Sequence, residues 1–84
     1  MKKRFSDCAW EDYLYWQKTD KKMLRKINEI LLDIDRHPFE GIGKPEALKH
    51  SLSGYWSRRI NLEHRCVYRI EANEIQIAQL RHHY

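Results

Sequence analysis

The chain has few of the residues that interrupt or cross-link a fold: three glycines, two prolines and two cysteines in 84 residues. Cys8 and Cys66 form no CxxC motif, which excludes a disulfide framework and predicts free, mostly buried thiols in a reducing compartment. No apolar run is long enough to span a bilayer. The N-terminal MKKRFSD lacks the apolar stretch of a signal peptide, so we expect a cytoplasmic protein without a membrane partner.

Apolar and basic residues are what the chain has in quantity. Hydrophobic residues make up 42% of it and aromatic residues 12%, a globular composition whose length predicts one domain over residues 1–84. A chain of this length buries only a modest core, so oligomerisation or a tightly bound partner would add stability. Residues 1–42 contain nine Lys/Arg and eight Asp/Glu, whereas residues 43–84 contain seven and four. This basic second half favours a polyanionic partner, although any single lysine fits an ordinary solvated surface.

The first half of the chain predicts a strand followed by two helices. Residues 2–5 can form the strand, and Ser6 or Asp7 is suited to cap a helix that runs to about Lys18. A second helix begins after Asp20 and ends at His37, before a proline. Its apolar residues recur with the helical period: Met23, Leu24, Ile27, Ile30, Leu31 and Ile34.

The second half predicts strands only. The period changes to two at Ala47, where Leu48, His50 and Leu52 alternate with polar or small residues and indicate a strand. Further strands are expected over 55–60, 65–71 and 74–81, with turns at 53–54 and 72–73. An N-terminal strand, two helices and an antiparallel strand meander make an α+β fold, with the helices on one face of the sheet.

Two surfaces of the expected helices allow more than one interpretation. An aromatic face on the first helix is more typical of a core or dimer contact than of a platform for stacking RNA bases. It consists of Ala9, Trp10, Tyr13, Leu14, Trp16 and Gln17. A basic cluster opens the second helix, where a solvated face and a contact to ribosomal RNA phosphates are the alternatives. It consists of Lys21, Lys22, Arg25 and Lys26.

The residues that indicate chemistry lie between Gly43 and Tyr68 and at the last two positions. They comprise one acid, several cations and a terminal imidazole, in order Glu46, Lys49, Arg58, Arg59, Arg65 and His83. This combination suits a reaction at a phosphodiester. Arginine binds phosphate in a bidentate manner and stays charged as negative charge grows in the transition state. A carboxylate and an imidazole can divide the base and acid roles.

The spacing of two arginines adds an argument about the expected hairpin. If its turn is centred near Leu62, Arg59 and Arg65 lie opposite each other on one face. Like charges directly opposite destabilise a strand pair, whereas an anion between them reverses the sign of that cost. A shift of one residue removes this geometry, and the sequence leaves the register open.

The segments GKPEALKH, LSGYWSRRI and EHRCVYRI, with a terminal HHY, resemble the YoeB/Txe toxins of the RelE/ParE superfamily. WEDYLYWQKTDKK near the start belongs to the same resemblance, which covers essentially the whole chain. It implies a RelE-like microbial RNase fold and a ribosome-dependent mRNA endonuclease. The family's functional positions fall on Glu46, Lys49, Arg59, Arg65, His83 and Tyr84. Cys8 and Cys66 stand where the family has other residues.

The resemblance also implies roles, partners and products. Glu46 takes a proton from a ribose 2′-hydroxyl, His83 protonates the leaving 5′-oxygen, and Arg65 stabilises the charged phosphate. Lys49 and Arg59 hold the RNA, and Tyr84 stacks on or orients a nucleotide. No metal or other cofactor is needed, because RNA carries its own nucleophile. The expected partners are mRNA in the ribosomal A site, a YefM-like antitoxin, operator DNA only through the antitoxin complex, and a second copy in a homodimer.

Plainer interpretations stand beside these. Glu46 can simply pair with Lys44 or Lys49, and His83 can belong to a frayed terminus. A zinc site is disfavoured, because neighbouring histidines in a strand point to opposite faces and no Cys/His spacing matches. On the same scaffold, a non-enzymatic ParE-like toxin that poisons gyrase is the alternative function. A module whose main task is to bind its antitoxin is a third.

Overall fold

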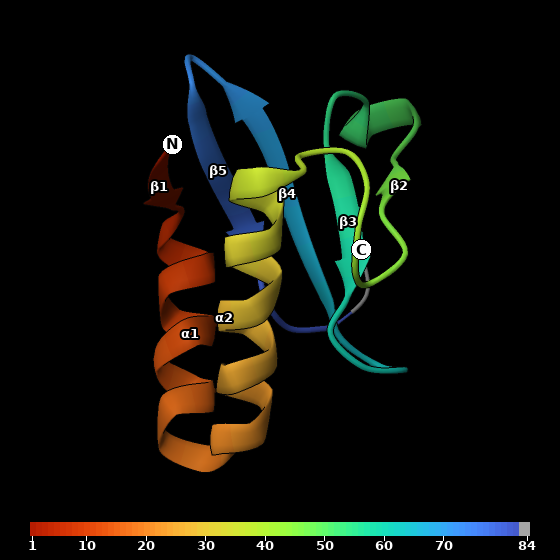
Figure 1. The fold of residues 1–84 in the computed structure, drawn as a ribbon. Helices are drawn as coiled ribbons and strands as arrows, with labels where there is room; N and C mark the ends of the chain where they lie inside the picture. Colours follow the sequence, from red (N-terminus) through yellow and green to blue (C-terminus); the bar gives the residue numbers. More distant parts are fainter. Residues whose placement is uncertain (83–84) are drawn as a thin grey trace.

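The computed structural model describes residues 1–82, which form two helices and a five-stranded sheet (Figure 1). In chain order the elements are β1 (Lys2–Phe5), α1 (Asp7–Thr19), α2 (Lys21–Arg36), β2 (Glu46–Ala47), the 3₁₀ helix η1 (His50–Leu52), β3 (Trp56–Arg59), β4 (Arg65–Glu71) and β5 (Glu74–Gln79). The predicted α+β layout, with a strand, two helices and a meander, is confirmed.

The sheet has the strand order β1-β5-β4-β3-β2. Strands β2 to β5 pair antiparallel with their sequence neighbours, whereas β1 pairs parallel with β5. The pairing of β1 with β5 continues just beyond the strand, because Ser6 donates its backbone N–H to the oxygen of Ile77 and its hydroxyl to that of Ala78. The start of α1 is thereby fixed beside the end of β5.

Both helices begin where the sequence predicts. Ser6 caps α1, its hydroxyl accepting the N–H of Ala9 at 3.0 Å. Asp20 ends α1 and caps α2, its carboxylate accepting the N–H groups of Lys22 and Met23. One short polar residue therefore makes the turn between the two helices, since it satisfies N–H groups that a helix start leaves unpaired. Neither helix has the length and apolar character needed to cross a membrane.

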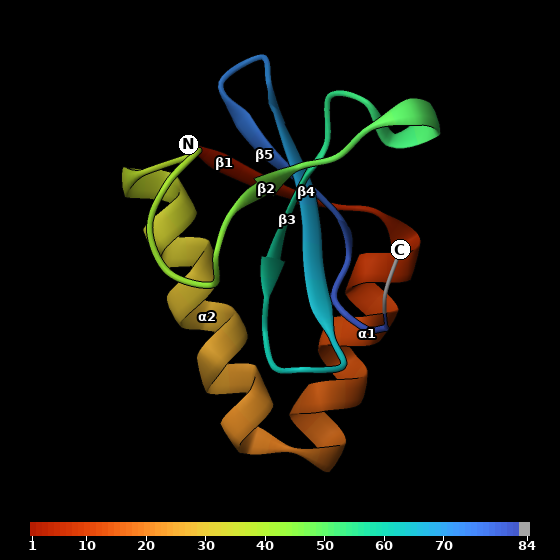
Figure 2. The same ribbon diagram turned by 90° about the vertical axis from the view of Figure 1, so that its right-hand side faces the viewer.

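The core lies between the helices and one face of the sheet. Figure 2, turned so that the β2–β3 edge faces the viewer, shows the helices behind the strands. From α2 the predicted apolar stripe contributes Ile27, Ile30, Leu31 and Ile34, and from α1 Ala9 and Trp16 are buried. The sheet contributes alternate residues of three strands: Ile60 just beyond β3, then Cys66, Tyr68, Ile75 and Ile77. Residues between them in β3 to β5 must therefore face away from the helices.

The aromatic residues of α1 divide between this core and the surface. Trp16 is buried, whereas Trp10 is 48% exposed and Leu14 is 42% exposed. Trp10 stacks on Tyr13 at 5.8 Å, and Phe5 meets both rings edge-on. The core interpretation therefore holds for Trp16 but does not account for Trp10 and Leu14.

The prediction of a strand from Ala47 to Leu52 is mostly wrong. Only Glu46 and Ala47 pair with β3, and His50–Leu52 forms the 3₁₀ helix η1. His50 adopts a φ of +58°, and the N–H groups of Leu52 and Ser53 bond to the oxygens of Lys49 and His50. These local bonds replace a ladder, so the apparent alternation of Leu48, His50 and Leu52 did not come from a strand.

The last strand is shorter than expected, because it ends at Gln79 and not near Arg81. A bulge between Val67 and Tyr68 shifts the register of β4 and β5. Directly after β5, the backbone of Leu80 is bound by side chains of α1. The Leu80 N–H donates to Asp12, and the Leu80 oxygen accepts the indole N–H of Trp16 at 2.9 Å. The chain leaves the sheet there because α1 supplies the hydrogen bonds that a neighbouring strand would supply.

Candidate active site

Three of the predicted site residues lie on the face of the sheet that the helices leave uncovered. Residues paired across a ladder point to the same face, as do alternate residues of one strand. Glu46 pairs with Ser57, and Arg59, two residues further along β3, pairs with Arg65. The core residues Cys66 and Tyr68 lie on the other face, because Cys66 directly follows Arg65 in β4. Glu46, Arg59 and Arg65 therefore share what we call the open face.

Arg59 and Arg65 stand directly opposite each other at the end of the β3–β4 hairpin. This is the register that the sequence predicts for a turn centred near Leu62. Arg59 is exposed and Arg65 half-buried. The Arg65 Nη1 atom donates to the backbone oxygens of Asn61 and His64 at 2.8 and 3.1 Å, which holds the guanidinium beside the hairpin loop. Two fixed positive charges thus meet at one end of the open face, a suitable place for a phosphate.

The predicted acid and lysine lie nearer the sheet edge. Glu46 opens the two-residue strand β2 and is exposed, and Lys49 caps the 3₁₀ helix two residues beyond that strand. Just before β2, the N–H of Arg59 donates to the oxygen of Gly43 at 2.7 Å. The strand pairing brings Glu46 and Arg59 onto the open face together, whereas no pairing places Lys49 there.

Arg58, the neighbour of Arg59, is not part of this face. It is fully buried on the helix side of the sheet. Its guanidinium donates to the Asp33 carboxylate, to the Tyr68 hydroxyl at 3.2 Å and to three backbone oxygens of the loop after α2. Those oxygens belong to His37, Glu40 and Ile42. Arg58, which the sequence counts among several cations near the site, therefore serves the fold, because its hydrogen bonds are made within the protein.

The Arg58 network fixes the loop that leads to Glu46. Asp33 accepts from Arg58 and also from the N–H of Ile42 at 3.0 Å. The hydrogen bond from Arg58 holds the pKa of the Asp33 carboxyl below its usual value of 3.8. The charged carboxylate is thus the stable form at neutral pH, and α2, the loop and β3 are joined by one ion pair.

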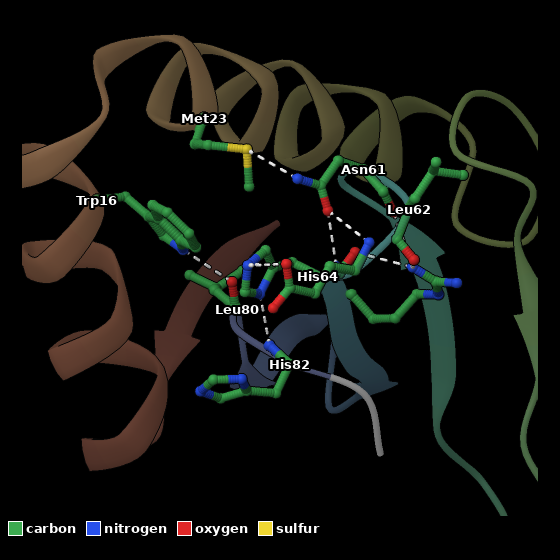
Figure 3. A network of polar contacts seen from close by, with 9 residues as sticks. Trp16, Met23, Asn61, Leu62, His64, Leu80 and His82 are labelled. Carbon is green, nitrogen blue, oxygen red and sulfur yellow. Dashed lines mark hydrogen bonds and ion pairs between the residues drawn. The ribbon is translucent and has the colours of Figure 1, made fainter.

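The C-terminal segment returns to the same end of the open face. The oxygen of His82 accepts the backbone N–H of Arg65 at 3.1 Å. The N–H of His82 donates to Nδ1 of His64 at 2.7 Å, as Figure 3 shows. The last described residue is therefore bound next to Arg65. The predicted residues His83 and Tyr84 lie outside the described residues.

His64 is buried, with 8% of its surface exposed. Glu63, His64 and His82 bring ligand atoms within 4.8 Å of one another, a cluster that the sequence did not indicate. However, Nδ1 of His64 accepts the His82 N–H, so the proton of the neutral ring is on Nε2. A metal at Nε2 would require that proton to leave, so the arrangement favours a hydrogen-bonding role.

Sequence reasoning missed Arg58, Asp12 and His64 as residues that shape the site. One signal was available for Arg58: alternation with the apolar residues Trp56 and Ile60 assigns it to the core face, opposite Arg59. No comparable signal existed for Asp12 and His64. Their partners are backbone groups of the C-terminal segment, and the contacts arise only when the chain folds.

The two cysteines differ. Cys66 is buried, as expected, and burial raises the pKa of its thiol to about 12. Cys8 is exposed, contrary to the expectation of mostly buried thiols, and its pKa is also raised, by partial burial and by Asp12. Neither thiol is activated as a nucleophile, because the thiolate is the reactive form.

Two helices on one face of a five-stranded sheet make an α+β fold that the chain shares with RelE-like toxins. Residues 5–84 match the family described as the YoeB-like toxin of bacterial type II toxin–antitoxin systems. The chain belongs to this family.

Individual relatives are similar over their whole length. Toxin YoeB of Escherichia coli O6:H1 (strain CFT073) is 58% identical over 84 residues, which is 100% of both chains. The toxin chain in the heterotetrameric YoeB–YefM complex from Staphylococcus aureus is 56% identical, with a TM-score of 0.93. The YoeB dimer from the same organism is 56% identical, with a TM-score of 0.94. Each of these two matches covers 100% of this chain and 98% of the other.

Proposed function

We propose that this chain is a ribosome-dependent mRNA endonuclease that cleaves translated mRNA in the ribosomal A site and so inhibits translation. The observation that carries the proposal is the placement of Glu46, Arg59 and Arg65 together on the open face. Membership of a toxin family supports it. An acid on the same face as two cations suited to phosphate can serve as the general base of the reaction.

The reaction is a transfer within the RNA itself. The 2′-oxygen of a ribose attacks the adjacent phosphorus as Glu46 takes the 2′ proton, and the bond from phosphorus to the 5′-oxygen breaks as His83 supplies a proton to that oxygen. The products are a 2′,3′-cyclic phosphate and a 5′-hydroxyl. One proton is taken and one is given, and no metal or other co-reactant enters the balance.

The cations act on the phosphate. Arg65 stabilises the extra negative charge of the pentacoordinate phosphate, and Arg59 and Lys49 assist it and hold the RNA backbone. Tyr84 orients a nucleotide by stacking. Arg65 is suited to stabilising this charge, because its Nη1 atom donates a hydrogen bond to the backbone oxygen of Asn61 and so fixes the guanidinium before substrate arrives. A preorganised charge costs no rearrangement during the reaction.

The proposal includes partners. The S. aureus relatives are described as a complex of YoeB with YefM and as a YoeB dimer. We expect this chain, acting as one toxin domain over residues 1–84 in the cytoplasm, to form a homodimer and to be neutralised by a YefM-like antitoxin. Operator DNA is bound only through that complex. An acidic antitoxin segment that folds on binding complements the net charge of +4.

The ends of the cut RNA test the chemistry. A reporter mRNA is translated with the purified protein, and the fragments are recovered. We expect the downstream fragment to be ligated only after a kinase adds its 5′-phosphate, and the upstream fragment to end in a cyclic phosphate. A matched mRNA with a single 2′-deoxy nucleotide at the cut site should stay intact there. A 5′-phosphate, or cutting at the deoxy position, would rule out attack by the 2′-hydroxyl.

A further inference from the structure

The segment after β5 is bound to the body of the protein by side chains as well as by backbone groups. Leu80 is held by Asp12 and Trp16 of α1. His82 is held by two groups of the β3–β4 hairpin, the N–H of Arg65 and the Nδ1 atom of His64. The second of these is the shorter, at 2.7 Å, and it is the contact that a side chain supplies. One of the contacts that fix the path of the chain up to His82 is therefore made by an imidazole.

The His64 ring is itself tightly positioned. It lies edge-on against the Trp16 ring, with centroids 4.8 Å apart. Its backbone N–H donates to the Asn61 side-chain oxygen at 2.7 Å, and its backbone oxygen accepts the N–H of Ile60 at 2.9 Å. In Figure 3 the ring lies between Trp16 and the C-terminal segment. An indole and a structured loop thus fix both the ring plane and the backbone of His64.

The hydrogen bond also sets the protonation state. Because Nδ1 accepts a backbone N–H, it carries no proton, and the single proton of the neutral ring is on Nε2. The titratable groups around the ring are Glu63, whose carboxylate lies 3.8 Å from Nε2, Asp12 of α1, and Arg81 and His82 of the C-terminal segment. Burial lowers the pKa of His64 below its usual value of 6.5, so the neutral ring predominates at pH 7.

We infer that His64 is a positioning residue: through its Nδ1 atom it anchors His82 beside Arg65, at the point from which the chain continues to the proposed acid. The inference rests on the function proposed above, in which His83 is the general acid. His64 does not touch the substrate. Its contribution is geometric, because an acid must lie within hydrogen-bonding reach of the leaving oxygen and small displacements of reacting groups cost large factors in rate.

Two substitutions separate the acceptor from the ring. In His64→Phe the ring can still pack on Trp16, but the acceptor is lost. In His64→Asn the side-chain oxygen can stand where Nδ1 stands, but the ring is lost. Two readouts are made on each variant: amide hydrogen exchange at His82, which does not depend on activity, and cleavage of translated mRNA at saturating and at limiting protein.

We expect His64→Phe to exchange the His82 amide about tenfold faster than wild type, the effect of losing one hydrogen bond. Its maximal cleavage rate should fall by about tenfold or more, with little change in the protein concentration needed for half-maximal rate. His64→Asn should keep exchange and cleavage within about threefold of wild type, although it unfolds at a lower temperature. Equal behaviour of the two variants would overturn the role of the acceptor, as would wild-type cleavage by His64→Phe.

Two further measurements make the outcome decisive. A nitrogen-15 spectrum of the histidine rings in the unmodified protein should show His64 with its proton on Nε2, and a proton on Nδ1 at neutral pH would overturn the inference even if a variant failed to fold. Deleting His83 and Tyr84 distinguishes the two proposals. Loss of cleavage in the deletion with full activity in His64→Phe removes the positioning role alone, whereas full activity in the deletion removes the proposed acid and its anchor together.

Discussion

At the scale of single residues, the Arg59–Arg65 pair is where stability and function conflict. Two like charges directly opposite on a ladder cost free energy, and the structure has them at the end of the hairpin. Arg65 offsets part of that cost by bonding to loop oxygens. A phosphate between the two guanidinium groups would offset the rest, which is a physical reason for the pair under the proposed function.

The proposed base and the arginine that binds the phosphate give the first prediction. Glu46→Gln and Arg65→Ala should each lower cleavage of translated mRNA by about a hundredfold or more, because these groups act on charge that develops during reaction. Since Arg65 also bonds to the hairpin loop, Arg65→Lys is made beside it, and it should be nearly as inactive while keeping the loop contacts. Lys22→Ala on α2 is the comparison and should lose much less. Equal cleavage by Arg65→Ala and wild type would remove the proposed mechanism.

The ion pair between buried Arg58 and part-buried Asp33 gives a prediction about stability. Asp33→Asn should lower the free energy of unfolding by about 3 kcal/mol, because it leaves the buried Arg58 without its counter-charge. Asp35→Asn loses a part-buried contact to the N-terminal amine but leaves no fully buried charge unpaired, so it should have a smaller effect. Urea unfolding monitored by tryptophan fluorescence measures both.

The sign of the pH dependence follows from the lowered pKa of Asp33. A carboxyl whose pKa is lower in the folded state contributes stability that is complete above 3.8 and is lost as the pH falls through the lower folded value. The difference in free energy of unfolding between wild type and Asp33→Asn should therefore be constant near neutral pH and become smaller below about pH 4. A difference in free energy of unfolding that increased in acid would contradict the assigned ion pair.

At the scale of elements, the loop between α2 and β2 decides where Glu46 lies. Gly43 has a φ of +79°, and a Cβ added there would lie 3.0 Å from the backbone oxygen of Arg59. Gly54 has a similar φ of +94° with nothing within 4 Å of an added Cβ. The two glycines therefore share the backbone requirement but differ in the space around them.

Alanine substitutions at these glycines form a matched pair. Both should lower stability by about 1 kcal/mol or somewhat more through the left-handed backbone. Gly43→Ala should in addition push β2 from β3, displace Glu46 and lower cleavage by about tenfold or more, whereas Gly54→Ala should cleave nearly as wild type. Similar cleavage rates for the two variants at equal stability would show that the placement of β2 does not limit the reaction.

The same elements show what a sequence can predict. The bounds of β4, the caps of both helices and the apolar stripe of α2 follow from local patterns, because their residues interact with near neighbours or with one continuous face. The 3₁₀ helix at His50–Leu52 and the early end of β5 do not, since they depend on a left-handed residue and on side chains of α1. In the site, pattern and resemblance together indicate Glu46 and Arg65, and alternation along β3 assigns Arg58 to the core face. The partners of Arg58 and the contact between His64 and His82 require the fold.

At the scale of the whole molecule, partner binding should control both stability and activity. The basic half of the chain carries the open face, and a chain of 84 residues has a limited core of its own. A partner that binds only the folded form adds about 2.7 kcal/mol at a concentration one hundred times its Kd. For a domain of this size, that corresponds to a rise in Tm of roughly 10 to 20 °C.

We therefore expect a YefM-like antitoxin to form a tight complex with this chain, to raise its Tm and to abolish cleavage. Differential scanning calorimetry and the translation assay are run on the same preparation. Reversing acidic residues of the antitoxin segment to lysine provides the control, and both effects should then disappear together. A stable complex that still cut mRNA at the full rate would show that the antitoxin leaves the open face accessible.

Primer extension on two matched messages tests whether the protein cuts mRNA only as the ribosome presents it. One message carries an intact start codon and the other a mutated one, and each is incubated in a translation extract with wild type or Glu46→Gln. We predict that wild type produces downstream fragments with new 5′ ends inside the reading frame, on the translated message alone. Glu46→Gln should produce none. Equal cutting of the untranslated message, or cutting by Glu46→Gln at the wild-type rate, would contradict the account.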